Sequence, residues 1–300
     1  MLNKNLLEKI NKVEALATAS KWARFAHNPF KYFSSIFFKE VIYKSRKKEK
    51  LVQCETFFEK EMYVYLPSST DIYLTKGKSH NSEIRLCRFL IKNLSLGEQF
   101  LDIGAHYGYF SLLAANLVGP KGRVVSYEAS PKTFEILKRN SESNIAIYNK
   151  AISDTNEPIR FFEFPNLYSE FNTTHIDQFK NEAWFLKHTP SEITVPAQTL
   201  DSVLFESAFD PDIIKIDVEG AEFNVLNGGR KYLAEKGPVV VMEFLSKERD
   251  NEEHVKAEQL MRNLGFQVYC ILENGDLMEI KDGSHYLSEN KMDSDNLVFL

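Results

Sequence analysis

Short apolar runs alternate with amphipathic stretches along most of the chain. The runs predict strands at 99–103, 122–127, 144–149, 212–217 and 238–243, and the amphipathic stretches predict helices at about 107–117, 131–140 and 252–264. Two further β-rich runs, 266–272 and 296–300, have no predicted helix between them, which indicates an antiparallel hairpin at the sheet edge. Strands that alternate with helices predict an α/β fold, with a seven-stranded sheet covered by helices on both faces.

The most informative stretch, 100–110, reads as a buried strand, a glycine turn and the start of a helix. Such a junction presents free N–H groups and a positive helix end at the sheet edge where α/β proteins bind ligands. A dinucleotide fingerprint would need glycine at the position of His106, and no phosphate-binding-loop string occurs. The spacing that remains is Asp102-x-Gly104-x-x-x-Gly108. This spacing by itself is also compatible with a tight turn that binds no ligand.

An acidic residue at the end of the next strand narrows the choice of ligand. Glu128 follows Gly108 by twenty residues, where a carboxylate can accept hydrogen bonds from both hydroxyls of a ribose. An adenosine without a pyrophosphate points to S-adenosylmethionine.

Four blocks of sequence then carry a family resemblance. They are Asp102-Ile-Gly-Ala-His-Tyr-Gly-Tyr-Phe-Ser-Leu, Val125-Ser-Tyr-Glu-Ala-Ser-Pro, Ile214-Lys-Ile-Asp-Val-Glu-Gly-Ala-Glu and the ending Asn296-Leu-Val-Phe-Leu. With these blocks, residues 60–300 resemble the FkbM family of methyltransferases. The resemblance implies a Rossmann-like class I methyltransferase sheet and S-adenosylmethionine-dependent methylation, usually of a hydroxyl on a sugar, polysaccharide or polyketide-like product. One departure is His106, where the family often has Asn.

We assign the cofactor site from the turn and the strand ends around it. The glycines let the turn approach the methionine portion, Glu128 takes the ribose, and the residues after it border the adenine. Asp102 either orients the turn or meets the cofactor ammonium; a purely structural role is an equal alternative. The expected cofactor-binding residues are Asp102, Gly104, Ala105, His106, Tyr107, Gly108, Glu128, Ala129, Ser130, Ala151 and Asp217.

Methyl transfer to a hydroxyl also needs a base that removes the proton of the acceptor. Asp217 and Glu219 follow the fourth strand, and one of them is our leading candidate. Glu243 closes the fifth strand at the same sheet edge, and His106 is the next candidate. Asp217 with Glu243 could instead hold Mg²⁺, although we favour a site without metal.

Three other charged residues near these motifs are given lesser roles. Glu222 is expected at the start of the next helix, where an acidic side chain suits the helix dipole. Lys215 lies inside the strand and is expected to face away from its neighbours, without a catalytic role. Glu83 lies where the family often has an acidic residue near the active site.

The segment 165–194 is too long for an ordinary connection, which predicts a lid or substrate loop. Its aromatic residues could stack on a sugar or base, or they could bury one another to hold the loop down. With the two histidines of the segment they are Tyr168, Phe171, Trp184, Phe185, His175 and His188.

Composition limits the remaining classes. The 300 residues are 43% hydrophobic and carry a net charge of −5, which argues against a generally basic nucleic-acid binder. Cys54, Cys87 and Cys270 are widely spaced, so neither a disulfide framework nor a zinc site is indicated. We expect a cytoplasmic protein, because no signal peptide or membrane-spanning run is visible.

Charge is concentrated at the start of the chain. Residues 1–60 hold 13 Lys and Arg against 6 Glu and no Asp, and the remaining residues carry a net −12. We therefore divide the chain into a basic, aromatic-rich helical extension (1–55) and a methyltransferase domain (56–300), with a hairpin and helix at 56–96 leading into the core at 97–300. The extension could pack on the domain or on the second subunit of a dimer, or residues 1–50 could contact an anionic membrane at its inner face. It would equally suit an anionic glycan or single-stranded nucleic acid.

The expected function is O-methylation of a sugar, glycan, lipid-linked saccharide or related natural product. RNA or protein methylation and a non-catalytic cofactor-binding scaffold are the alternatives. Neither an Asn/Asp-Pro-Pro-Tyr string nor a Pro-Cys pair occurs, which argues against the common nucleic-acid chemistries. A scaffold would be expected to have lost Glu128 or Asp217, and both are present.

Overall fold

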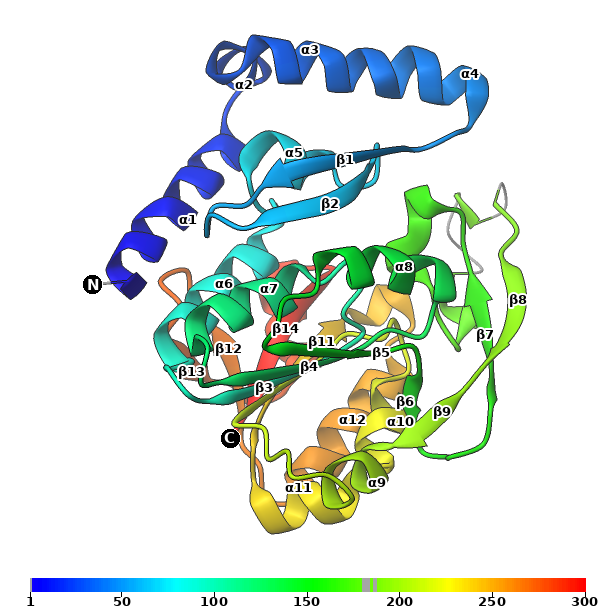
Figure 1. Ribbon diagram of the computed structural model, residues 1–300. Coiled ribbons are helices and arrows are strands. Elements are labelled where there is room, and N and C mark those ends of the chain that lie inside the picture. Colours follow the sequence, from blue (N-terminus) through cyan, green and yellow to red (C-terminus); the bar gives the residue numbers. More distant parts are fainter. Residues whose placement is uncertain (1, 180–183, 186–187) are drawn as a thin grey trace.

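The computed structural model describes residues 2–179, 184–185 and 188–300. Within them, the main sheet has eight strands in the order β13-β12-β14-β11-β10-β3-β4-β5 (Figure 1). The strands are β3 (Gln99–Ile103), β4 (Arg123–Tyr127), β5 (Ile145–Tyr148), β10 (Ile213–Ile216), β11 (Val239–Leu245), β12 (Val268–Ile271), β13 (Leu277–Glu279) and β14 (Ser294–Phe299). The strands from β5 to β11 are parallel, and β14 is antiparallel to both its neighbours.

Helices cover both faces of this sheet, because successive strand residues point to opposite sides. Phe100 packs with one set of helices and Leu101 with the other. The first set is α6 (Asn81–Asn93), α7 (Tyr109–Val118) and α8 (Pro131–Asn140). The second set is α9 (Leu200–Phe205), α10 (Glu222–Asn227), α11 (Arg230–Lys236), α12 (Glu252–Asn263) and α13 (Gly283–Asn290), with a short 3₁₀ turn, η5 (Lys247–Arg249), before α12. The predicted α/β class is confirmed, and the expected strands and helices appear near their predicted positions.

The carboxyl-terminal part differs from the prediction in two ways. Both β13 and α13 lie between β12 and β14, so the two final runs are not a simple hairpin, and the sheet has an eighth strand. The strand β14 also lies between β11 and β12 rather than at the edge. Its residues Leu297, Val298 and Phe299 are fully buried, which an inner position requires. The helix was missed because its sequence is mostly polar, with only one short apolar stretch at Tyr286 and Leu287.

Smaller strand pairs occupy the connection between β5 and β10. β6 (Ala151–Ser153) pairs in parallel with β9 (Ala197–Thr199), and β7 (Ile159–Glu163) pairs antiparallel with β8 (Ser191–Val195). The expected loop 165–194 contains the 3₁₀ turns η2 (Asn166–Phe171) and η3 (Ile176–Phe179) and the start of β8; its positions 180–183 and 186–187 lie outside the described residues.

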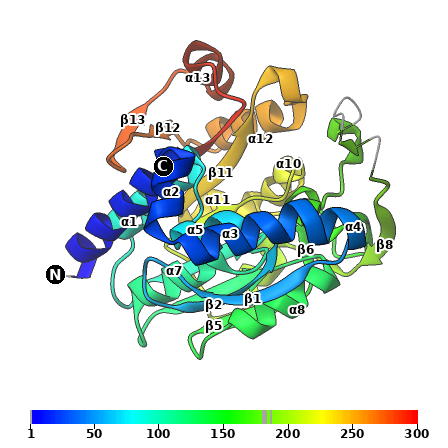
Figure 2. The same ribbon diagram turned by 90° about the horizontal axis from the view of Figure 1, so that it is seen from above.

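The amino-terminal residues form an outer layer (Figures 1 and 2). Its helices are α1 (Leu2–Thr18), α2 (Lys21–His27), α3 (Pro29–Phe37), the π-helical η1 (Phe38–Tyr43) and α4 (Lys44–Arg46). They are followed by the hairpin of β1 (Lys50–Glu55) and β2 (Glu61–Leu66) and by α5 (Thr70–Thr75). The hairpin begins at residue 50, so the division expected after residue 55 falls between its two strands. The domain limits remain a prediction.

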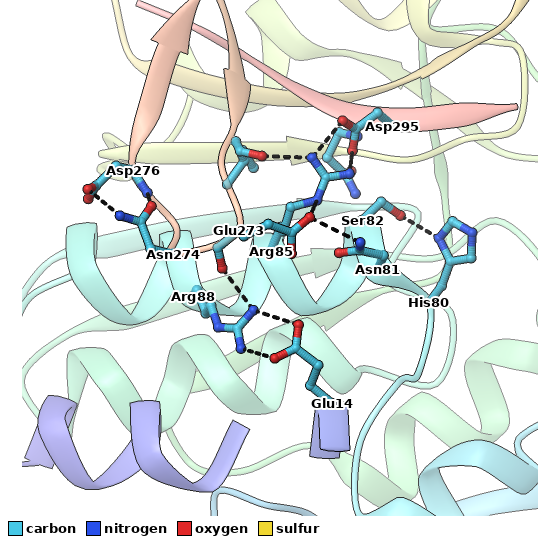
Figure 3. A network of polar contacts seen from close by, with 12 residues as sticks. Glu14, His80, Asn81, Ser82, Arg85, Arg88, Glu273, Asn274, Asp276 and Asp295 are labelled. Atoms are coloured by element: carbon cyan, nitrogen blue, oxygen red, sulfur yellow. Dashed lines mark hydrogen bonds and ion pairs between the residues drawn. The ribbon is translucent and has the colours of Figure 1, made fainter. Parts of the chain in front are cut away.

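Two buried arginines of α6 form ion pairs with β14 of the main sheet and with α1 of the outer layer (Figure 3). Arg85 forms a two-pronged ion pair with Asp295 of β14, with N–O distances of 2.9 and 3.0 Å. Arg88 pairs with Glu14 of α1 at 2.6 Å and donates a hydrogen bond to the carbonyl oxygen of Glu273. The helix α1 is thus tied to the body of the protein, while α2 to α4 lie further out.

Candidate active site

A cavity of about 330 Å³ opens at the carboxyl ends of β3, β4, β10 and β11. Each of these strands delivers one residue of the predicted site to the lining: Gly104, Glu128, Asp217 and Glu243. The volume lies in the range of small-molecule sites. Parallel strands explain this convergence, because their carboxyl ends meet at one edge of the sheet.

The turn after β3 requires glycine for a steric reason. Gly104 has a φ of +79°, and a Cβ at this position would lie 1.8 Å from the carbonyl oxygen of Asp217. Gly108, with a φ of +86°, ends the turn immediately before α7. The ends of β3 and β10 therefore touch through their backbones. Glycine at position 104 lets the two ends approach this closely.

Glu128 holds this turn and also faces the cavity. Its two carboxylate oxygens accept hydrogen bonds from the backbone N–H groups of His106 and Ser130, both at 2.9 Å. Burial raises the pKa of Glu128 to about 7, against the lowering effect of these two N–H groups. Ser130 itself lies outside the cavity lining, and its hydroxyl donates to the buried Glu163.

A buried lysine sets the charge of Asp217. Lys215 donates to Asp217 Oδ2 at 3.0 Å and lies 3.6 Å from Asp102 Oδ1. Burial alone would raise the pKa of Asp217, but Lys215 and Lys78 outweigh it and hold the pKa below its usual range. Asp102 is fully buried, accepts a 2.6 Å hydrogen bond from Ser111 and lies outside the cavity lining. These contacts fit the purely structural role that the sequence left open for Asp102.

Three carboxylates face one another at this edge of the sheet. One oxygen each of Asp217, Glu219 and Glu243 lies within 4.8 Å of the others. Burial and the charges of Glu243 and Asp217 raise the pKa of Glu219 well above its ordinary value. Burial, together with Asp217 and Glu222, raises the pKa of Glu243 to about 7. Such a cluster could bind a cation or exchange a proton.

Glu222 supports the loop that carries Asp217 and Glu219, from the side away from the cavity. This residue begins α10, is fully buried and accepts a 3.1 Å hydrogen bond from the N–H of Val218. Its other oxygen lies 3.1 Å from Nε2 of the buried His254. Burial would lower the pKa of His254, but Glu222 raises it above its ordinary value. Glu222 therefore positions the loop from outside the cavity.

His106 reaches the cavity from a left-handed backbone conformation with a φ of +51°. Its Nε2 lies 2.9 Å from the hydroxyl of Ser169, and its ring stacks on Tyr107 at a centroid distance of 3.8 Å. Burial, followed by the charge of Lys78, lowers the pKa of His106 to about 3. The imidazole is therefore neutral at physiological pH.

The remaining predicted residues divide between the lining and its support. The lining includes Gly104, His106, Glu128, Ala129, Ala151, Asp217, Glu219 and Glu243, together with Glu83. Ala105 and Tyr107 instead line a separate space of about 20 Å³, and Gly108 lines neither space.

The sequence did not single out several polar residues of the lining. They are Lys78, His80, Ser82, Glu170, Arg249, Ser294 and Asn296. Lys78 forms an ion pair with Glu83 and lies 3.9 Å from Glu170. Burial raises the pKa of Glu170 to about 7. The antiparallel direction of β14 explains Ser294 and Asn296, because this strand begins where β11 ends. No sequence motif around Lys78 indicates that it is a site residue.

Most of the aromatic residues of segment 165–194 pack against one another. The ring of Trp184 stacks on Tyr168 and on Phe171, with centroid distances of 4.8 Å in both cases. Phe171 also lines the cavity, as do Ser169 and Glu170. The segment thus forms one wall of the cavity, and its aromatic cluster holds that wall together.

Comparison with known proteins identifies the family. Residues 102–268, more than half of the chain, match the methyltransferase FkbM domain. The chain belongs to the FkbM methyltransferase family. The matched part of this FkbM chain contains Glu128 and the carboxylate cluster. Residues 39–153 also match the protein-L-isoaspartate (D-aspartate) O-methyltransferase family.

Individual relatives of this FkbM chain are more distant. Methyltransferase sdnD of Sordaria araneosa is 30% identical over 165 residues, which cover 46% of this chain and 62% of that protein. The chain thus spans less than two thirds of the curated relatives it matches.

Solved structures give similarity at low sequence identity. An FkbM methyltransferase from Methylobacillus flagellatus KT is 15% identical, covers 78% of this chain and 53% of its own, and has a TM-score of 0.42. An S-adenosylmethionine-dependent O-methyltransferase from Thermotoga maritima is 13% identical, covers 86% and 80%, and has a TM-score of 0.39.

Proposed function

We propose that this protein transfers a methyl group from S-adenosylmethionine to a hydroxyl of a sugar, glycan or related natural product. The observation that carries the proposal is the cluster of Asp217, Glu219 and Glu243 beside the glycine turn, in a cavity that also exposes Glu128. Family membership supports methyl transfer. The carboxylates support an acceptor that must lose a proton.

The residues around Glu128 fit an adenosyl cofactor. The carboxylate of Glu128 can accept from ribose hydroxyls, and the neighbouring lining is largely apolar, with Ala129, Ala151, Ile152 and Phe161. An apolar slot beside a hydrogen-bonding carboxylate suits an adenine and its ribose. Bound there, the cofactor would supply an electrophilic methyl group. The protein's part is to orient the acceptor and remove its proton.

Glu243 is the carboxylate best matched to this proton transfer. Its pKa of about 7 leaves a large ionised fraction near neutral pH together with appreciable basicity. Asp217 stays ionised through Lys215 and is therefore a weaker base. Burial and the charges of Glu243 and Asp217 raise the pKa of Glu219 well above its ordinary value, which favours its protonated form as a hydrogen-bond donor to the acceptor. We therefore assign the base to Glu243 rather than to Asp217 or Glu219.

The mixed charge of the lining supports a polyhydroxylated acceptor. Lys78 and Arg249 supply donors, and Glu170 and Asn296 supply acceptors, around the same space. A sugar carries many hydroxyl groups that both donate and accept, so alternating donors and acceptors can satisfy it.

The test is incubation of the protein with cofactor labelled in its methyl group and with fractionated cell glycans, RNA and protein. We expect label in the glycan or small-molecule fraction, in a linkage stable to mild base. Label in RNA or protein would contradict the acceptor class. Calorimetric binding of the cofactor without transfer to any fraction would indicate a scaffold.

A further inference from the structure

The outward face of α3 and η1 carries a stripe of large apolar side chains. Phe30, Phe33, Phe37 and Val41 are spaced so that they lie along one side of the helix, with 83%, 67%, 46% and 50% of each residue exposed. Trp22 of the adjoining α2 is 80% exposed. The part of the chain that the structure describes thus leaves between 46% and 83% of each of these five residues exposed. An exposed apolar surface of this kind marks an interaction site.

The opposite side of the same helix is firmly packed. Phe38 and Tyr43 are buried against Leu66 of β2, and Leu167 at the start of the loop 165–194 contacts the same cluster. Figure 1 shows α3 as the outermost layer, with the β1–β2 hairpin beneath it. The stripe is therefore presented from a fixed helix and faces away from the body of the protein.

Basic side chains surround this stripe. Residues 21–48 contain eight Lys and Arg and one acidic residue, Glu40, which is paired with Lys44. The exposed basic residues are Lys21, Lys39, Lys44, Arg46, Lys47 and Lys48. Apolar aromatic side chains next to an excess of lysine are typical of helices that lie in the interface of an anionic bilayer.

We propose that α2, α3 and η1 form a docking surface for an anionic phospholipid bilayer. The aromatic side chains of the stripe enter the headgroup and acyl boundary, with the helix parallel to the membrane plane. The lysines reach the phosphate groups while their alkyl chains lie along the apolar surface. No helix among the described residues is long and apolar enough to cross a membrane. This proposal does not depend on the proposed methyl transfer.

Charge favours the bilayer over a second copy of the chain. In a two-fold symmetric dimer the stripe of one protomer would face the same stripe of its partner. Each protomer would bring the same net +7 from residues 21–48. Repulsion between these like charges opposes such a dimer, whereas an anionic lipid surface neutralises them.

The helix α1 does not belong to this surface, although it lies within the basic segment. Its residues Leu6, Ile10 and Val13 are buried in the main core, and Glu14 is paired with Arg88. The docking surface is thus limited to residues 21–48.

Flotation of the full chain with vesicles tests the proposal. We expect the protein to float with vesicles of phosphatidylcholine and phosphatidylglycerol, to remain behind with phosphatidylcholine alone, and to be released by high salt. In a Trp184→Phe variant, Trp22 is the sole tryptophan, and its fluorescence should shift to shorter wavelength on addition of the anionic vesicles.

Matched variants locate the contact. Phe33→Ser combined with Phe37→Ser should weaken vesicle binding about tenfold or more. Leu96→Ser removes a side chain of similar exposure (75%) outside the extension and should leave binding unchanged. Thermal unfolding of each variant confirms that the fold is intact.

Three results would overturn the proposal. They are equal flotation with neutral and anionic vesicles, no loss of binding in the double variant, and a wild-type dimer in light scattering that the double variant converts to a monomer. The last result would assign the stripe to a second copy of the chain.

Discussion

At the residue scale, Gly104 shows how one missing side chain shapes the site. Its backbone lies against the end of β10, and any Cβ would meet the carbonyl of Asp217. Gly104→Ala should lower the free energy of unfolding by at least about 3 kcal/mol, because a left-handed backbone and a steric clash combine. Gly237→Ala is the control. It has a φ of +58° but nothing within 4 Å, and should cost only about 1–2 kcal/mol. Denaturant unfolding measures both, and equal losses would contradict the steric explanation.

The pKa of Glu243 leads to a prediction for the pH dependence of activity. If Glu243 is the base, kcat/KM should rise with pH and level off above about 7, where the carboxyl is ionised. Glu243→Gln should lower kcat by about 10²–10⁴-fold and remove this rise. Glu248→Gln, which changes an exposed residue of η5, should retain the wild-type profile. A wild-type rate in Glu243→Gln would reassign the base to Asp217 or Glu219.

The raised pKa of Glu243 also affects the free energy of unfolding, which should fall as the pH rises, whereas activity should increase. Because folding raises the pKa of Glu243 from 4.5 to about 7, its stabilising contribution is complete below the lower value and is lost as the pH rises through the higher one. The wild type should lose stability between about pH 5 and about pH 8, and Glu243→Gln should not. The free energy of unfolding of the variant minus that of the wild type should therefore be larger at about pH 8 than at about pH 5. Urea unfolding at the two pH values gives the comparison. A stability difference that does not change with pH would show that the carboxyl has an ordinary pKa.

The carboxylate cluster also leads to a prediction about metal. Lys215 lies 3.0 Å from Asp217 and already balances the charge of one of the three carboxylates. We therefore expect EDTA to leave the rate of methyl transfer unchanged. Loss of activity that Mg²⁺ restores would assign the three carboxylates to a metal site.

At the element scale, α6 connects parts of the chain that are distant in sequence. Arg85 is buried together with Asp295 of β14, and their side chains form the two-pronged ion pair. Arg85→Met should lower the free energy of unfolding by about 3–5 kcal/mol, because it leaves a buried carboxylate without its partner. Lys92 of the same helix forms an exposed pair with Asp276, which lies just before β13. Lys92→Met breaks this pair and should cost at most about 1 kcal/mol. Similar losses in the two variants would contradict this dependence on burial.

Elements with a strong local pattern were predictable. The strands β3, β10 and β11 are apolar runs buried on both faces, and α8 follows Ser130 as its N-cap, with Pro131 in its first turn. The helix α13, which has a mostly polar sequence, and the strand β13, which has only three residues, were missed. Their positions depend on packing against β12 and β14 rather than on local periodicity.

At the scale of the whole molecule, cofactor binding should stabilise the fold. Any ligand that binds only the folded state adds about 2.7 kcal/mol at one hundred times its Kd. S-adenosylmethionine should therefore raise the Tm by several degrees. Glu128→Gln should reduce this shift, because the neutral amide replaces one of the two acceptor oxygens of the carboxylate with an NH₂ donor. Glu135→Gln, which changes an exposed residue of α8, should retain the full shift. A normal shift in Glu128→Gln would contradict the assigned role.

Several features could be predicted from the amino-acid sequence: the α/β class, the glycine turn, Glu128 and the three carboxylates. These features follow from local periodicity and from motif spacing, because parallel strands bring their carboxyl ends to one edge. The three-dimensional arrangement was needed to show that Asp102 and Ser130 lie outside the cavity lining. It was also needed to show that Lys78, Glu170 and Asn296 belong to that lining. It also distinguished α1, which buries Leu6, Ile10 and Val13 in the core, from α3 with its exposed stripe. The physical reason is that charge balance and burial depend on neighbours distant in sequence. Lys78, which is distant in sequence from Asp217, joins Lys215 in lowering the pKa of that carboxyl.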